Sequence, residues 1–88
     1  MEEKRSMKYA CPCCGYKTLE IKPPGTYDIC EICFWEDDGV QFDDPDYEGG
    51  ANSESLRQYQ KAFLMGRVNR RPTDKDERDQ DWTPLSEK

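Results

Sequence analysis

The sequence predicts a small α+β domain that is stabilised by a bound metal ion. Two Cys-x2-Cys pairs are separated by fifteen residues. Of the 88 residues only 34% are hydrophobic, whereas 36% are charged. A core built from so few apolar side chains would be thin, so a cross-link is expected. An amphipathic segment over residues 52–65 predicts one helix after the metal-binding part.

The cysteines of the two pairs are the candidate metal ligands: Cys11, Cys14, Cys30 and Cys33. Their spacing is typical of a tetrahedral metal site, because a two-residue insertion allows a turn that brings both sulfur atoms to one ion. Thiolates are soft ligands, so this set favours zinc, with iron as the alternative. Four protein ligands leave no position for water, and a closed site of this kind is structural.

Cys13 is the odd cysteine, and two interpretations compete for it. In the first, Cys11 and Cys14 bind the metal and Cys13 is a free thiol on the turn. In the second, Cys13 replaces one of them or exchanges with it. The Cys-x2-Cys spacing matches that of the second pair, so we favour the first interpretation. We then expect Cys13 to be the only thiol that a mild reagent alkylates in the metallated protein.

Short strands are expected on both sides of the cysteine turns. Residues 8–10 predict a strand that enters the first turn, and residues 16–21 alternate as a strand that leaves it. Proline and glycine at residues 23–26 signal a turn, after which residues 27–29 are expected to return and deliver Cys30. Two cysteine turns at strand ends are the arrangement of a zinc ribbon or a rubredoxin-like site.

The residues after the second turn are predicted to belong to the core. Phe34 and Trp35 are expected to cover the metal site, although a stacking platform for a nucleic-acid base is the alternative. Val40 and Phe42 stand two apart, as in a short strand with one buried face.

A loop rich in carboxylates follows, with four acidic side chains in six residues: Asp43, Asp44, Asp46 and Glu48. The spacing does not meet the calcium-loop pattern, so we interpret the loop as fixed by side-chain bonds to the backbone and as a candidate interaction surface. These carboxylates have no nucleophile or base arrangement around them, and we do not expect an enzyme.

The predicted helix covers residues 52–65, with Asn52 as its N-cap. Leu56, Tyr59 and Phe63 form an apolar stripe that is expected to pack against the cysteine-bearing part. The charged residues beyond Gly66 predict a flexible tail. Trp82 is an exception within it, and the sequence leaves open whether this side chain folds back onto the domain or contacts a partner.

Charge is distributed unevenly along the chain. Residues 23–55 contain ten acidic groups and no lysine or arginine. A partner of this part should be cationic or neutral, and phosphate backbones would be repelled. Nucleic-acid binding, a frequent role of zinc ribbons, is therefore disfavoured, and the arginines at positions 67, 70 and 71 are its only support. No apolar run is long enough to span a membrane.

Three blocks resemble the bacterial cysteine-rich CPCC family. The first is Cys11-Pro12-Cys13-Cys14-Gly15-Tyr16, and the second runs from Tyr27 to Asp38 and includes Cys30-Glu31-Ile32-Cys33-Phe34-Trp35. The third comprises Asp44-Pro45, Gly49-Gly50-Ala51-Asn52 and Ser55-Leu56. The resemblance covers residues 9 to about 66. It implies a small bacterial protein with a metal site, and it implies no established activity.

The domain organisation expected from these observations has three parts. Residues 1–7 form a flexible N-terminus, residues 8–66 the zinc-binding domain, and residues 67–88 the charged tail. We expect a structural zinc protein that acts through contacts with another protein. The alternatives are rubredoxin-like electron transfer or thiol redox chemistry, and a nucleic-acid-binding ribbon. Five cysteines and a polar start, without the apolar core of a secretory signal, predict a reducing, cytoplasmic location.

Overall fold

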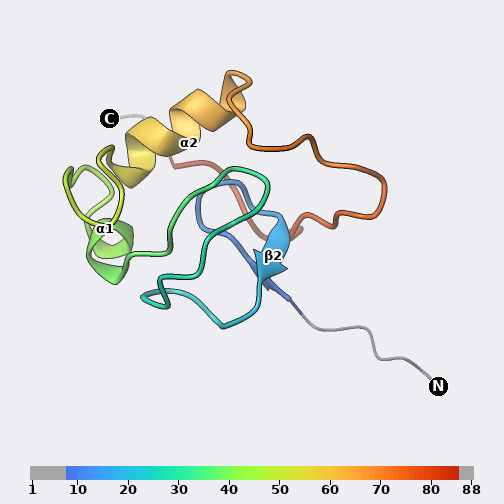
Figure 1. Ribbon diagram of the computed structural model, residues 1–88, viewed down its shortest axis with the longest axis horizontal. Helices are drawn as coiled ribbons and strands as arrows, with labels where there is room; N and C mark the ends of the chain where they lie inside the picture. The colour runs from blue at the N-terminus through green and yellow to red at the C-terminus, as the bar shows by residue number, and fades with distance from the viewer. Residues whose placement is uncertain (1–7, 86–88) are drawn as a thin grey trace.

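The computed structural model describes residues 8–85, and the predicted flexible segment 1–7 lies outside them. Two strands and two helices occur in this range, in the order β1 (Tyr9–Ala10), β2 (Lys17–Leu19), α1 (Gly39–Asp43) and α2 (Leu56–Leu64). The cysteine-bearing turns lie between β2 and the helices, and α2 runs across one side of them (Figure 1). The small α+β architecture is therefore as predicted, with one more helix than expected.

The first cysteine turn is the tip of a β hairpin. Strands β1 and β2 pair antiparallel, with Tyr9 opposite Leu19 and Ala10 opposite Lys17. The backbone N–H of Cys11 donates to the carbonyl of Tyr16 at 2.9 Å and extends the hairpin to the cysteines. The strand predicted over residues 16–21 is thus shorter than expected.

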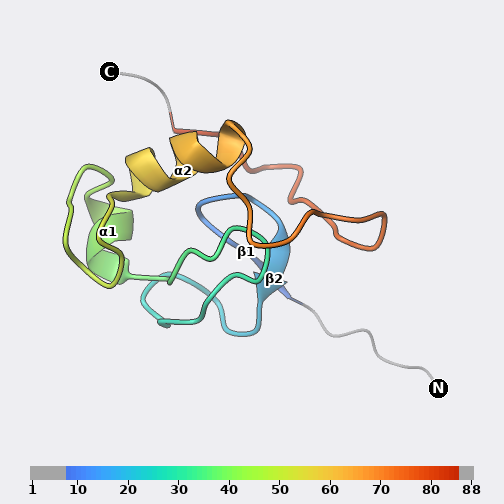
Figure 2. The ribbon, with the colours of Figure 1, turned by 45° about the horizontal axis from the view of Figure 1, so that its top comes forward.

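The second cysteine turn forms a hairpin of its own. Ile29 and Glu36 make an isolated antiparallel bridge, and the N–H of Tyr27 donates to the carbonyl of Asp37 at 2.8 Å. The segment 27–29 was expected to return and deliver Cys30. It pairs with the residues that follow its own cysteines, so each turn has a separate hairpin (Figure 2).

Helix α1 replaces the strand predicted around Val40 and Phe42. Asp38 is its N-cap and accepts hydrogen bonds from the N–H groups of Val40 and Gln41. Val40 is 58% exposed and Phe42 is 43% exposed, whereas Gln41 is completely buried. The alternation of apolar residues therefore gave the wrong element and the wrong buried face, because the N-cap and a buried amide determine the local structure.

Helix α2 begins later than predicted. Ser55 is the N-cap, and its side chain and that of Gln58 form a reciprocal capping box. Asn52 is buried in the preceding loop, where its amide nitrogen donates to the carbonyl of Glu36 at 2.8 Å. The predicted N-cap role of Asn52 is therefore wrong, because its side chain already joins two loops.

The apolar stripe of α2 packs as predicted. Leu56 and Phe63 are buried with the five cysteines, Leu19, Ile32 and Trp35 in one core, and Tyr59 packs against it. The ring of Tyr59 meets that of Trp35 edge to face, with centroids 5.1 Å apart.

The segment after α2 runs back to the first hairpin. The N–H of Lys17 donates to the carbonyl of Glu77, and the N–H of Asp79 donates to the carbonyl of Gly15, each at 2.8 Å. Tyr16 and Arg78 form an antiparallel bridge. The mobility predicted for residues 67–88 stays a prediction, but its described part up to residue 85 has defined contacts with the domain.

No helix in the part of the chain that the structure describes is long and apolar enough to cross a membrane.

Candidate metal centre

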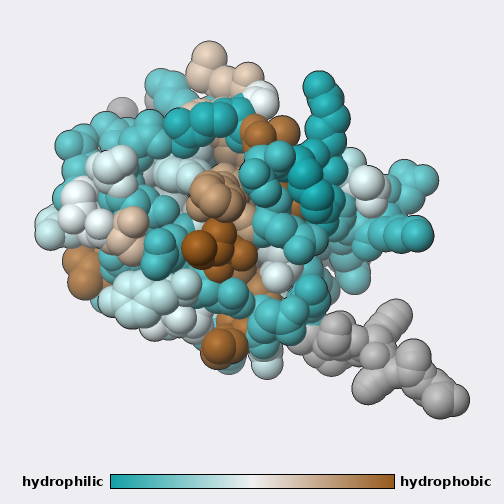
Figure 3. Space-filling model, viewed as in Figure 1, coloured by the Kyte–Doolittle hydropathy of each residue, from teal (hydrophilic) through white to brown (hydrophobic). Residues whose placement is uncertain are grey.

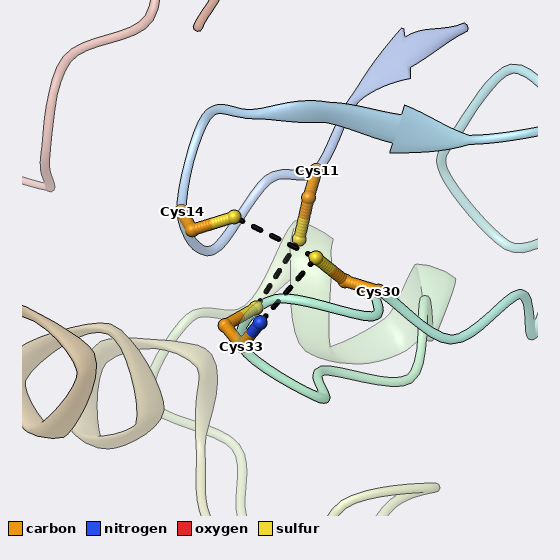
Figure 4. A group of neighbouring side chains, drawn as sticks. All are labelled: Cys11, Cys14, Cys30 and Cys33. Carbon is orange, nitrogen blue, oxygen red and sulfur yellow. Dashed lines mark hydrogen bonds between the residues drawn. The ribbon is translucent and has the colours of Figure 1, made fainter. Parts of the chain in front are cut away.

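The four predicted ligands come together in one buried group. The Sγ atoms of Cys11, Cys14, Cys30 and Cys33 all lie within 4.8 Å of one another, and these residues are between 0 and 4% exposed. The Sγ atoms of Cys11 and Cys33 are 3.6 Å apart, as are those of Cys14 and Cys30. Figure 4 shows the four side chains converging from the two turns.

The spacing of the sulfur atoms fits a tetrahedral ion. Four ligands at about 2.3 Å from one centre stand about 3.8 Å apart, which is close to the two observed separations. The donor set is sulfur only, as zinc and iron accept and as magnesium and calcium do not. The group could therefore hold a metal ion with little rearrangement.

The two cysteine turns have the same backbone design. The N–H of Cys11 donates to the carbonyl of Tyr16, and the N–H of Gly15 donates to the carbonyl of Cys11 at 2.8 Å. The second turn has the same two bonds at the equivalent positions. The N–H of Cys30 donates to the carbonyl of Trp35 at 3.0 Å, and the N–H of Phe34 donates to the carbonyl of Cys30 at 2.8 Å. We call these turns the first knuckle (11–16) and the second knuckle (30–35).

The residue after each second cysteine has a positive φ, which is 82° at Gly15 and 73° at Phe34. Glycine adopts this conformation without strain. A phenylalanine in the same place is an outlier among residues with bulky side chains.

Hydrogen bonds concentrate on the sulfur of Cys30. Thr18 Oγ1 donates to it at 3.0 Å, and the backbone N–H groups of Ile32 and Cys33 donate at 3.4 and 3.5 Å. These bonds stabilise a thiolate. Thr18 is a contributor that the sequence analysis missed, since nothing in its local pattern distinguishes it from an ordinary strand residue.

The thiols ionise unequally because they share one site. Hydrogen bonds from Cys11, Cys14 and Cys33 lower the pKa of the Cys30 thiol. Contacts with Cys14 and Cys30, together with burial, raise the pKa of Cys11. The pKa of Cys33 is also raised, first by its contact with Cys11. Four neighbouring thiolates repel one another, so full ionisation needs a cation in their midst.

Cys13 lies outside the four-sulfur group and is completely buried. Its carbonyl accepts a hydrogen bond of 3.0 Å from the side-chain amide of Gln60 on α2. The predicted exposure of Cys13 is therefore wrong, and selective alkylation of this thiol is no longer expected. The reason is long-range: α2 and the segment after it cover the turn, which the spacing of the cysteines does not reveal.

Residues far along the chain cover the first knuckle. Trp82 Nε1 donates to the carbonyl of Pro12, and Arg78 Nε donates to the carbonyl of Cys14, each at 3.0 Å. A Cβ atom added at Gly15 would lie 2.5 Å from the Trp82 ring. Trp82 thus folds back onto the domain and is half-buried there, and its role in an interaction surface stays a prediction.

Phe34 and Trp35, which follow Cys33, differ in burial. Trp35 is completely buried, as predicted, but Phe34 is 56% exposed. The prediction that both rings cover the metal site is therefore wrong for Phe34, because its place at the end of the knuckle directs the side chain outwards.

The carboxylate loop lies between α1 and α2. Asp43 and Asp44 are exposed. Asp46 forms an ion pair with Arg57 at 2.7 Å, and Glu48 accepts a hydrogen bond from Gln58 at the same distance. No cluster that includes these carboxylates is arranged for a metal among residues 8–85. Their role as an interaction surface stays a prediction.

The sequence pattern of a known family agrees with this geometry. The family described as Cysteine-rich CPCC matches residues 9–81. The chain belongs to this family. The match extends past residue 66, where the resemblance was expected to end, and so includes the segment with Arg78 that covers the first knuckle. A comparison with curated proteins finds no match.

Proposed function

We propose that this cysteine-rich CPCC protein is a small structural zinc protein that acts through contact with another protein. The observation that carries the proposal is the closed group of four buried sulfur atoms, two pairs of which are 3.6 Å apart. All four positions of a tetrahedron are then taken by the protein, so no position remains for water or substrate. This argues for a structural rather than a catalytic role.

Zinc is the favoured metal, and iron is the second candidate. The three hydrogen bonds to the sulfur of Cys30 support iron, because bonds to the ligating sulfur atoms tune the reduction potential of an iron site. They also support zinc, since they stabilise the thiolate that either ion requires. Because a tetrahedral set of four sulfur atoms suits both ions, the metal available in the cell decides between them.

Metal analysis of the protein as isolated tests this assignment. Native mass spectrometry should find one zinc ion per chain. Cys14→Ser should lose tight binding, and Cys13→Ser should keep one ion and serve as the matched control on the same turn. One iron per chain with a visible absorption band would favour the electron-transfer role. A metal-free protein with disulfides would contradict both assignments.

Metal removal tests the structural role. Because a preformed site rarely exists in the unfolded state, metal binding and folding are coupled. A strong chelator should therefore unfold residues 8–42, as measured by circular dichroism and by loss of the dispersed amide signals of both knuckles. An unchanged spectrum at equilibrium with the metal removed would contradict the proposal.

The protein-contact role is supported by charge. The ten acidic groups and absent basic groups of residues 23–55 favour a cationic or neutral partner. The arginines that would support nucleic-acid binding are partly engaged: Arg67 is paired with Glu54 at 2.7 Å, and Arg70 is paired with Asp76 at 2.9 Å. Nucleic-acid binding therefore remains the less favoured proposal. The cytoplasmic location is part of our proposal, because five cysteines without disulfides suit a reducing compartment.

A further inference from the structure

The two knuckles share their backbone design but differ in what covers them. At the first knuckle, Gly15 provides the positive φ and the ring of Trp82 lies where a side chain would be. At the second knuckle the equivalent residue is Phe34, with a φ of 73° and 56% of its surface exposed. A residue other than glycine in this conformation costs about 1–2 kcal/mol.

The exposed ring of Phe34 is therefore not explained by the fold. A glycine would form the same knuckle, as Gly15 does, and would remove the backbone strain. Strained residues that persist in a structure point to a function of the side chain. The carbonyl of Phe34 is fixed by a hydrogen bond of 3.1 Å from the hydroxyl of Tyr59, so the backbone that presents the ring is held in place.

Two more apolar side chains are exposed on the same hairpin. Ile29, which is 48% exposed, pairs with Glu36 in the bridge that adjoins the second knuckle. Tyr27 is 61% exposed and has a φ of 61°. Among the described residues, Tyr27 and Phe34 are the two that have a positive φ and are not glycine. Figure 3 shows apolar surface near the centre of this face, over the second hairpin. We call Tyr27, Ile29 and Phe34 the Phe34 patch.

The surroundings of the Phe34 patch specify the charge of its partner. It lies within residues 23–55, which contain ten acidic groups and no lysine or arginine, and the segment after α2 brings Arg70 to Glu31 of the second knuckle. Asp28 and Glu36 of the same hairpin take part in no ion pair among the described residues, so the charge beside the patch stays negative. A second copy of the chain would bring two such acidic surfaces together, which disfavours self-association. A cationic segment would be attracted instead.

The protein itself shows how its aromatic rings are covered. Arg78 stacks on both Tyr16 and Trp82 with 4.8 Å to each centroid, and Arg67 stacks on Tyr59 at 4.6 Å. Arginine is suited to this role because its planar guanidinium is weakly hydrated and stacks on aromatic faces. At the first knuckle, one segment supplies both the arginine and the apolar ring.

We propose that the Phe34 patch is a docking surface for an arginine-rich segment of another protein that also carries apolar side chains. Asn69 and Arg70 already contact the second knuckle at Glu31 and Ile32. The partner segment would cover the exposed ring of Phe34 on this knuckle, as residues 78–82 cover the first knuckle. The inference rests on the proposed protein-contact role and specifies the surface and the chemistry of the partner.

The test uses the full-length, metal-loaded protein and a synthetic peptide of six alternating arginine and tryptophan residues with blocked ends. Amide chemical shifts in a titration should change most at residues 27–36. Phe34→Gly should keep the metal and the fold and weaken the peptide at least tenfold. Met65→Ala is the matched control, since Met65 is 80% exposed and lies outside the patch, and this variant should bind as the wild type does.

Several outcomes would overturn the docking proposal. These are shift changes centred elsewhere, equal affinity in Phe34→Gly, equal binding of a peptide with glutamate in place of arginine, or self-association through the patch. If Phe34→Gly does not fold, Ile29→Ser gives the same test, and unchanged affinity in that variant overturns the proposal. The metal content of the protein as isolated, measured before the titration, separates the two hypotheses. One bound metal without peptide binding removes the docking surface alone, whereas a protein that is isolated without metal and binds none removes the proposed function.

Discussion

Gly15 has a positive φ of 82° and no room for a side chain. An added Cβ would lie 2.5–2.8 Å from three carbon atoms of the Trp82 ring. Two separate penalties therefore apply to a substitution here. One is the backbone conformation, which residues with a side chain rarely adopt, and the other is displacement of a packed ring.

Gly15→Ala should therefore lower the free energy of unfolding by about 2–4 kcal/mol, from about 1–2 kcal/mol of backbone strain and a similar overpacking term. Gly49→Ala is the matched control, because Gly49 has a φ of 85° and nothing within 4 Å of an added Cβ. This control should show the backbone penalty alone. Chemical denaturation of the zinc-loaded proteins measures both, and equal losses would mean that Trp82 does not press on the first knuckle in solution.

Asp38 provides a pH-dependent contribution to stability. Hydrogen bonds from the N–H of Ala51 and, at the start of α1, from those of Val40 and Gln41 lower the pKa of this carboxyl. A lowered pKa in the folded state means that the charged form is stabilised by folding. The contribution is present above the unfolded pKa of about 3.9 and is lost as the pH falls through the folded value.

The difference in unfolding free energy between the wild type and Asp38→Asn should consequently be about 1 kcal/mol or more at pH 7 and should shrink below about pH 4. Using the difference removes the contribution of metal release, which both proteins share. Urea titrations at several pH values measure it. A difference that stays constant from pH 7 to pH 3 would show that the charge of Asp38 does not matter.

At the scale of the elements, the buried side chain of Gln41 holds helix α1 against the loop that precedes α2. The amide nitrogen of Gln41 lies 3.0 Å from the carbonyls of Tyr47, Asn52 and Glu54, and its oxygen accepts from the backbone N–H of Asn52. Gln41 is completely buried, so no water can replace these bonds. The amide thus connects α1 to both ends of the loop that precedes α2.

Gln41→Ala should cost about 2–4 kcal/mol, because buried carbonyl and N–H groups lose their partner and a cavity remains. Val40→Ala is the control on the same helix and should stay within about 0.5 kcal/mol, since Val40 is 58% exposed. Thermal unfolding of both variants measures the contrast. A larger loss in the Val40 variant would restore the strand-like buried face that the sequence predicted.

The burial of Gln41 is a feature that the local sequence pattern does not predict. The cysteine spacing predicted a local geometry that depends on few residues, and the four sulfur atoms do gather as expected. Likewise, the stripe of Leu56, Tyr59 and Phe63 follows from helical periodicity. The burial of Gln41 depends on acceptors six to thirteen residues away, and nothing in the local pattern around Val40 and Phe42 indicates it.

At the scale of the whole molecule, the segment after α2 completes the core. Besides its bonds to the first knuckle, it donates a hydrogen bond to α2: the N–H of Leu85 donates to Gln60 Oε1 at 2.7 Å. Gln60 in turn donates to the carbonyl of Cys13. These contacts explain why Cys13 is buried. They join residues that are distant in sequence, so the composition of the segment alone predicted a flexible tail.

If this segment protects the metal centre, loosening it should accelerate metal loss without changing the number of ions bound. Trp82→Ala removes the ring over Gly15 and the hydrogen bond to Pro12. It should speed the transfer of zinc to a chromophoric chelator several-fold, because exchange then requires less opening of the first knuckle. Lys75→Ala is the matched control in the same segment, since Lys75 is exposed, and it should exchange at the wild-type rate. Equal rates in the two variants would mean that zinc leaves through the second knuckle, where Phe34 is already open to solvent.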